Sequence, residues 1–207
     1  MWVVRMQEEE AEAPGGLSIQ GAFSIGRAAR AKLDRQIEGL EVAREAGVDA
    51  ESLWATVRRL AAAVTVVTAQ GDEGYVGITV SACCVASLEP PLALVCIHEG
   101  SQVLDAISSS GAFAITVLSS RQELLAEMFA GRAPRPDPSF STIKHRVAST
   151  GAPILAGGLA WLDCRLHQVY PGGDHTIFLG TVVAAGVAAS QEDPLLYFGS
   201  QYRRLAP

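Results

Sequence analysis

The chain has 207 residues, 49% of them apolar and 18% charged, which is enough apolar material for the core of one ordinary domain. A net charge of −6, without a cluster of lysine and arginine larger than a pair, argues against a nucleic-acid-binding protein, because such proteins need a concentrated positive surface. No apolar run reaches the roughly 18 residues of a membrane span, and the acidic N-terminus does not resemble a secretory signal.

Residues 1–50 are predicted to be an extension that precedes the main domain, residues 51–207. Residues 1–27 combine three consecutive glutamates with a Pro-Gly-Gly sequence, a composition typical of disorder. Residues 28–46 carry apolar side chains at helical spacing and are followed by a glycine, which commonly ends a helix. A second helix is expected over 51–62, with Asp49 as its N-cap.

From residue 64 onward the pattern changes to β-branched, strand-like runs. Turns are expected at 70–74 and 171–174, and a bend ending in Pro90-Pro91 is expected between the second and third strands. The predicted strands cover 64–69, 75–81, 92–97, 113–118, 159–169, 176–187 and 195–198.

Helices and a loop interrupt these strands. The capping box Ser120–Glu123 predicts a helix over the apolar residues that follow it, and prolines at 134, 136 and 138 predict a surface loop. Strands with short connections and no regular β-α-β alternation indicate a mainly β fold with flanking helices, arranged as an antiparallel barrel. No G-x-G-x-x-G sequence follows a strand, so a Rossmann nucleotide site is not expected.

Polar groups at the ends of these strands are the candidates for ligand binding. Thr79 and Ser81 share one face of a strand that begins near Gly77, so two hydroxyls and nearby amides can bind a phosphate or the edge of a heterocycle. The alternative is an ordinary edge strand with solvent-facing hydroxyls. Ser101 can cap a helix whose N-terminus attracts an anion, or it can be a cap without any ligand.

His175 follows Asp174 at the mouth of the last long hairpin. An imidazole there can donate a hydrogen bond, bear a charge or orient an amide of a substrate, although a lone histidine beside an aspartate can also have no function. His98, His145 and His167 have no partner at metal-ligand spacing, so no metal site is expected. The absence of a G-x-S-x-G sequence argues against a hydrolase nucleophile.

The four cysteines, Cys83, Cys84, Cys96 and Cys164, lie in apolar, strand-like runs without metal-type spacing. We expect them to be free structural thiols in a reducing cytoplasm. Cys83 and Cys84 are the exception to consider, because neighbours on a strand face opposite sides and one of them can reach a ligand.

Taken in order, several segments resemble the short-chain flavin reductase family, the NAD(P)H:flavin oxidoreductases of two-component flavin monooxygenases. The resemblance covers about residues 54–205. It depends on the order and spacing of Val64–Thr68, Gly77–Ser81, Ser87–Leu92, Ser110–Phe113, Phe129-Ala130, Ala160–Cys164, Gly173–His175 and Pro194–Tyr197.

The resemblance implies a split β-barrel of the FMN-binding type, a homodimer, FMN or FAD as flavin, and NADH as reductant, with NADPH possible. It implies that reduced flavin passes to a monooxygenase component. It places His175 beside the nicotinamide as the catalytic residue, with Tyr202 near the same pocket. The flavin contacts that it implies are Gly77, Ile78, Thr79, Val80, Ser81, Ala82, Cys83, Cys96, Ile97, Ser101, Gln102 and Val103, with Ser101–Val103 at the flavin phosphate.

Two other functions remain open on the sequence. One is a reductase with tightly bound FMN that acts on another electron acceptor. The other is a flavin-binding redox module without catalysis, which the N-terminal helices and the Cys83-Cys84 pair would suit. For the flavin reductase itself, the expected ligands are free flavin and a nicotinamide nucleotide, and neither nucleic acid nor a membrane is an expected partner.

Overall fold

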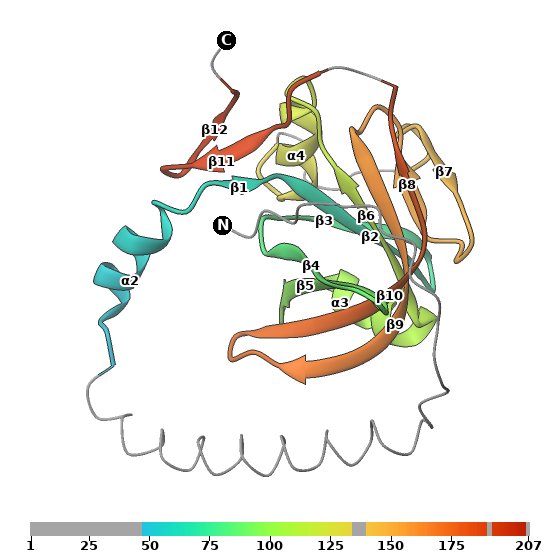
Figure 1. Cartoon of the computed structure of the whole chain (residues 1–207), viewed down its shortest axis with the longest axis horizontal. Coiled ribbons are helices and arrows are strands. Elements are labelled where there is room, and N and C mark those ends of the chain that lie inside the picture. The colour runs from blue at the N-terminus through green and yellow to red at the C-terminus, as the bar shows by residue number, and fades with distance from the viewer. Residues whose placement is uncertain (1–46, 134–139, 190–191, 206–207) are drawn as a thin grey trace, which may run out of the picture. The chain divides into compact units, whose positions relative to one another are not determined.

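A computed structural model describes residues 47–133, 140–189 and 192–205 (Figure 1). The chain divides into two units, Met1–Leu53 and Trp54–Pro207. The predicted disordered start, the predicted helix over 28–46 and the core of the predicted proline loop lie outside the described residues. The proposed boundary between an extension, 1–50, and a main domain stays a prediction.

The first described helix, α2 (Ala50–Val57), is capped as predicted but is shorter than predicted. Asp49 Oδ1 accepts a hydrogen bond from the Ser52 amide at 2.8 Å. The prediction that this helix continues to residue 62 was wrong. The amides of Arg59 and Leu60 bond three residues back, in a closing turn, and the next residues enter a strand instead.

The described residues are mainly β, with twelve strands and three helices. The other helices are α3 (Gln102–Ser110) and α4 (Glu123–Phe129). The strands are β1 (Ala62–Ala63), β2 (Thr65–Gly71), β3 (Gly74–Val80), β4 (Cys83–Leu88), β5 (Pro91–His98), β6 (Ala112–Val117), β7 (His145–Val147), β8 (Pro153–Leu155), β9 (Ala160–Pro171), β10 (His175–Val187), β11 (Leu196–Phe198) and β12 (Gln201–Arg203). None of the helices in this part of the chain is long and apolar enough to cross a membrane.

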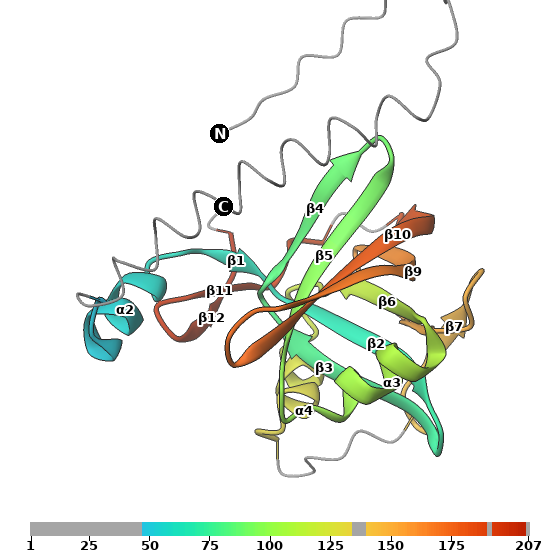
Figure 2. The ribbon, with the colours of Figure 1, turned by 90° about the horizontal axis from the view of Figure 1, so that it is seen from below.

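Seven strands form the main sheet, in the order β3-β2-β6-β9-β10-β5-β4, and all its pairs are antiparallel, as predicted. Two small antiparallel sheets, β1-β11-β12 and β7-β8, accompany it. The edges of the main sheet are β3 and β4, which do not pair with each other among the described strands, so the sheet is not a closed barrel. In Figure 2 the β4–β5 hairpin extends beyond the neighbouring strands.

All seven predicted strands are present, but the bend predicted between residues 81 and 92 was wrong, because this stretch contains β4. Small and apolar residues follow one another there without alternation, so the sequence gives no period-2 signal. Pairing with β5 determines the structure instead. The predicted cap at Ser120 was also wrong by two residues, since Gln122 is the N-cap of α4. The Gln122 side chain accepts a hydrogen bond from the Ser119 amide at 3.0 Å.

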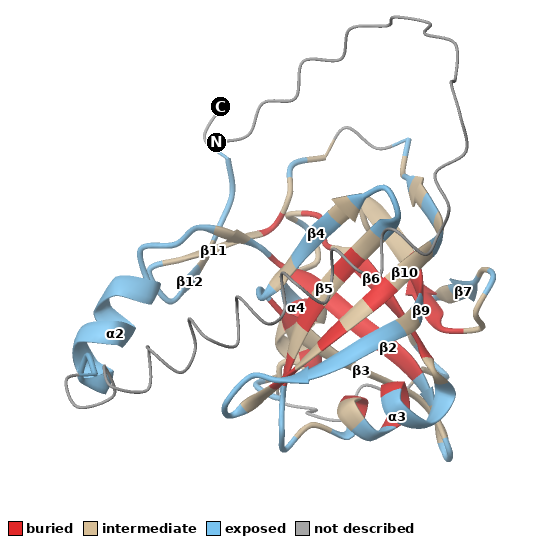
Figure 3. Ribbon diagram, turned by 60° about the horizontal axis from the view of Figure 1, so that its bottom comes forward, coloured by how far each residue is buried: buried red, intermediate tan, exposed pale blue. Residues whose placement is uncertain are grey.

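Strand β2 is buried along most of its length (Figure 3). It separates two clusters of apolar side chains. Val67 and Ala69 join the first cluster, with Phe113, Phe178 and the buried face of α3. Their neighbour Val66 points the other way, into a second cluster that includes Phe129 of α4. Helices α3 and α4 therefore lie on opposite faces of the sheet at β2 and β3, and the edge strand β3 runs between them.

Candidate functional site

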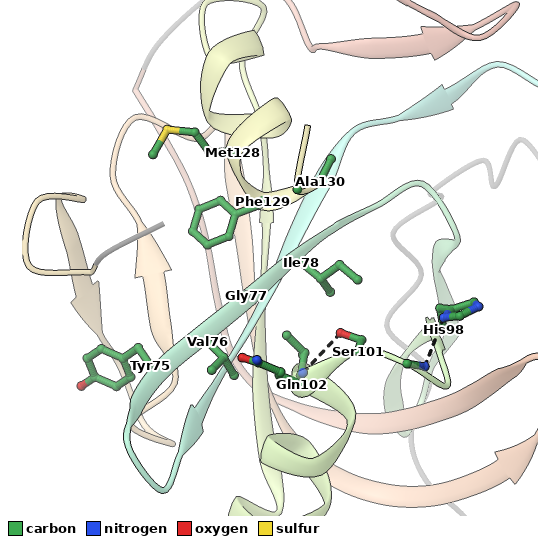
Figure 4. A pocket seen from close by; sticks show the side chains of 13 residues that line it. Tyr75, Val76, Gly77, Ile78, His98, Ser101, Gln102, Met128, Phe129 and Ala130 are labelled. Carbon is green, nitrogen blue, oxygen red and sulfur yellow. Dashed lines mark hydrogen bonds between the residues drawn. The ribbon is translucent and has the colours of Figure 1, made fainter. Parts of the chain in front are cut away.

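A cavity of about 520 Å³ lies along the edge strand β3 (Figure 4). Consecutive residues Tyr75–Ile78 line it from both faces of the strand, so the cavity runs along the free edge of the sheet. The turn before α3 and its first residues line one side, and the end of α4 lines another. An edge strand presents backbone N–H and C=O groups on its open side, and the volume is within the range of small-molecule sites.

Gly77 lies in the part of the cavity lining formed by β3, at a position where a side chain would not fit. A Cβ atom built on Gly77 would lie 2.6 Å from Cε1 of Phe129 and 3.2 Å from Cγ2 of Thr68. The ring of Phe129 is buried and packs near Phe140, with ring centroids 5.6 Å apart. The glycine therefore lets α4 approach β3 closely and leaves the backbone of β3 at the cavity surface.

The start of α3 supplies the polar side of the cavity. Ser101 is the N-cap, as the sequence allows, and its Oγ accepts a hydrogen bond from the Val103 amide at 3.2 Å. Gln102 also lines the cavity. The first amides of a helix lack partners within the helix and favour a negatively charged group, so the phosphate of a nucleotide suits this side.

The next residues of β3 line a second, smaller cavity of about 120 Å³ with Tyr202. Thr79, Val80 and Ser81 all contribute to it. The hydroxyl of Thr79 donates to the Ala126 carbonyl at 2.7 Å. The same hydroxyl can therefore only accept a hydrogen bond from a ligand. Both cavities include Ala130, so they adjoin at the end of α4.

Tyr202 is held by a polar cluster at the second cavity. Arg132 donates to the Tyr202 hydroxyl at 3.0 Å and to Glu127 at 2.8 Å. Burial, followed by the hydrogen bond with Glu127, raises the pKa of Tyr202 to about 12. The phenol is therefore neutral at physiological pH.

His175 lies at the start of β10, and its ring packs edge-to-face on His98, with centroids 5.4 Å apart. His98 lines the large cavity and His175 does not. Asp174 Oδ1 is 2.7 Å from His175 Nδ1, and this hydrogen bond lowers the pKa of Asp174. The histidine pair thus connects the mouth of the β9–β10 hairpin with one end of the cavity.

The structure brings most of the predicted flavin contacts to these two cavities. Gly77, Ile78, Ser101, Gln102 and Val103 line the larger one, and Thr79, Val80 and Ser81 line the smaller one.

The remaining predicted contacts, Ala82, Cys83, Cys96 and Ile97, line neither cavity. Ile97 is fully buried in the first apolar cluster, and the Ala82 carbonyl accepts a hydrogen bond from the Cys96 amide at 3.0 Å. Burial raises the pKa of the Cys83 thiol to about 11, which fits a structural thiol. The assignment of these four residues to flavin stays a prediction.

Several cavity residues were not predicted from the sequence, above all His98, Met128 and Arg132. His98 carried a signal that can be recognised, because it directly follows the strand predicted over 92–97 and lies just before the Ser101 cap. Arg132 carried none, since it comes next to Glu127 and Tyr202 only through the folding of the chain.

Comparison with known proteins shows which proteins the chain is similar to. The sequence profile described as "Flavin reductase like domain" matches residues 57–206. The chain is 33% identical over 176 residues to the FMN reductase (NADH) RutF of Ancylobacter novellus, which covers 85% of this chain and 95% of that protein. It is 38% identical over 155 residues to the reductase component of 4-hydroxyphenylacetate 3-monooxygenase from Thermus thermophilus, which covers 75% of this chain and 96% of that protein.

A solved structure agrees with these relatives. The NADH:FAD oxidoreductase SgcE6 of Streptomyces globisporus, in complex with NAD and FAD fragments, superposes with a TM-score of 0.69 at 34% identity. The match covers 78% of this chain and 98% of that one.

Proposed function

The chain belongs to the flavin reductase family, and we propose that it transfers a hydride from NADH to FMN or FAD and supplies the reduced flavin to a monooxygenase component. The observation that carries this proposal is the cavity along β3, which gathers Gly77, Ile78 and Ser101–Val103 at one ligand-sized site. The named relatives include an FMN reductase, an NADH:FAD oxidoreductase and a monooxygenase reductase component, which supports each part of the proposal. NADPH is the alternative reductant.

The residues present fit a flavin. The open edge of β3 can face the polar edge of a planar ring, and Gly77 permits the close backbone approach that this requires. The cavity is lined with apolar side chains by Val76, Ile78 and Phe129. Ser101 and Gln102, at the start of α3, would hold the phosphate.

When bound, the flavin supplies the ring that accepts the hydride, and the protein supplies binding and orientation. Residues of β3 and the start of α3 would hold this ring by its edge and its phosphate, leaving one face open to the nicotinamide. His175, held by Asp174, would position the nicotinamide at that face. Tyr202 would add a neutral hydroxyl near the second cavity.

Three further features belong to the proposal. The curled main sheet with open edges at β3 and β4 would be a split β-barrel of the FMN-binding type, as in the family. The protein would be a homodimer. It would act in the cytoplasm, where its four free cysteines, Cys83, Cys84, Cys96 and Cys164, would stay reduced.

The test is steady-state oxidation of NADH by the purified protein, followed by its near-ultraviolet absorbance, with and without added FMN or FAD. The proposal predicts oxidation that depends on added flavin. Flavin binding without any turnover would contradict it and favour a redox module. Flavin that stays bound through dialysis, with turnover of another acceptor, would favour a reductase of a different kind.

The variant His175→Ala tests the assigned position of the nicotinamide. Loss of a positioning hydrogen bond should raise the KM for NADH by roughly threefold to tenfold and lower kcat less. The matched control is His167→Ala, because His167 is exposed on β9 and lines neither cavity. An unchanged KM in His175→Ala would contradict this role.

A further inference from the structure

The imidazole of His98, at the end of the large cavity, packs against the imidazole of His175. His98 and His175 are register partners on β5 and β10, and their rings are nearly perpendicular, at 89°. His98 lies at the cavity end in Figure 4. Neither ring is isolated, because each has a hydrogen-bond partner on Nδ1.

These partners fix different proton positions on the two rings. His98 Nδ1 is 3.1 Å from the Gly100 amide nitrogen. A backbone amide can only donate, so this Nδ1 is an acceptor and the neutral ring carries its proton on Nε2. His98 therefore offers a donor to a ligand.

The partner of His175 has the opposite character. Asp174 accepts through Oδ1 at 2.7 Å, and its lowered pKa keeps it a carboxylate at neutral pH, which can only accept. His175 Nδ1 therefore carries a proton, and in the neutral form of the ring Nε2 is an acceptor.

The surrounding backbone holds both rings in place. The Glu99 amide donates to the Asp174 carbonyl at 3.1 Å, and the Ser101 amide donates to the His98 carbonyl at 3.0 Å. The Thr176 hydroxyl donates to Glu99 Oε1 at 2.6 Å. The ends of β5 and β10 are thus tied together around the histidine pair, and its donor and acceptor are preorganised.

A primary carboxamide has the complementary groups, an oxygen that accepts and an NH2 that donates. We propose that His98 and His175 together recognise the carboxamide of the nicotinamide ring, with His98 Nε2 donating to its oxygen and His175 Nε2 accepting from its NH2. This inference rests on the proposed function and adds His98 as a specificity-determining residue. It also assigns each histidine to one half of the carboxamide.

The test uses 3-acetylpyridine adenine dinucleotide, in which a methyl group replaces the NH2 and the oxygen is kept. Dissociation constants of the oxidised dinucleotides are measured by calorimetry on flavin-free protein, and KM values of the reduced ones by turnover. The wild-type chain should bind the acetyl analogue roughly threefold to tenfold more weakly than the nicotinamide form, because one hydrogen bond is lost.

The variants separate the two halves of the carboxamide. His175→Phe should bring the ratio of the two dissociation constants close to one, because the acceptor for NH2 is gone. His98→Phe keeps an aromatic ring against His175 but removes the donor, so both ligands should weaken by a similar factor and the ratio should persist. His98→Gln, which keeps an N–H donor, should recover much of the lost affinity.

His167→Phe is the matched control and should change neither constant. A ratio that His175→Phe leaves at the wild-type value would overturn the inference, and so would unchanged affinities in His98→Phe. Absence of flavin-dependent NADH oxidation by the wild-type chain would overturn the proposed function and this inference with it. Normal turnover with unchanged ratios would overturn this inference alone.

Discussion

The replacement Gly77→Ala tests the packing that makes the cavity. The added Cβ would lie 2.6 Å from Phe129 Cε1 and 2.9 Å from Cδ1, so the ring or the strand must move by several tenths of an ångström or more. Overpacking of this kind costs about 1–3 kcal/mol. Replacing a glycine also lowers the conformational entropy of the unfolded chain, which offsets about 0.4–1 kcal/mol of this cost. With the middle of each range, the net loss of unfolding free energy should be about 1.3 kcal/mol.

The assay is urea unfolding of the flavin-free protein, with Gly47→Ala as the control because no atom lies within 4 Å of a Cβ built at Gly47. The double variant with Phe129→Leu removes Cε1, the nearer of the two ring atoms that clash. It should therefore be less destabilised than the sum of the single variants by about 1 kcal/mol. A Gly77→Ala protein as stable as the wild type, or single effects that simply add, would contradict a close contact between position 77 and the Phe129 ring.

Three further predictions concern caps, thiols and alkaline pH. Ser101→Ala should lower the unfolding free energy by about 1 kcal/mol in urea titrations, and an unchanged midpoint would show that the cap contributes nothing. In the native protein Ellman's reagent should label the exposed Cys84, whereas Cys164, fully buried and with its pKa raised to about 12, should react only on unfolding. Rapid labelling of both thiols would contradict this. The pKa of Tyr202 rises from 10.0 to about 12 on folding, so the contribution of its neutral phenol to stability is complete below pH 10 and is lost as pH rises toward 12. Tyr202→Phe should therefore reduce the fall in unfolding free energy over this pH range. The same fall in the variant and the wild type would contradict this prediction.

The sequence predicts the strands well, because most of them combine β-branched runs with clear turns. The hairpin of β9 and β10 and the Ser101 cap fall where the residue pattern places them. Strand β4 and the early end of α2 could not be predicted in the same way. They depend on pairing with β5 and on the entry into β1, and a local pattern does not report such long-range contacts.

The site could be predicted where its residues follow one another in the chain. Gly77–Ser81 and Ser101–Val103 come to the cavities as two such runs. His98, Arg132 and Phe129 enter through packing between separate elements, and only the folded chain shows why Gly77 must face an aromatic ring. The partners that fix the two histidine tautomers are likewise visible only in three dimensions.

The most direct measurement is an anaerobic transfer experiment in which the protein, excess FMN and NADH are mixed and the free flavin is separated by ultrafiltration. We expect reduced flavin to appear in the filtrate in proportion to the NADH consumed, and only when the protein is present. Flavin that is not reduced, or reduced flavin that remains entirely with the protein, would contradict the claim that this chain supplies reduced flavin to another enzyme.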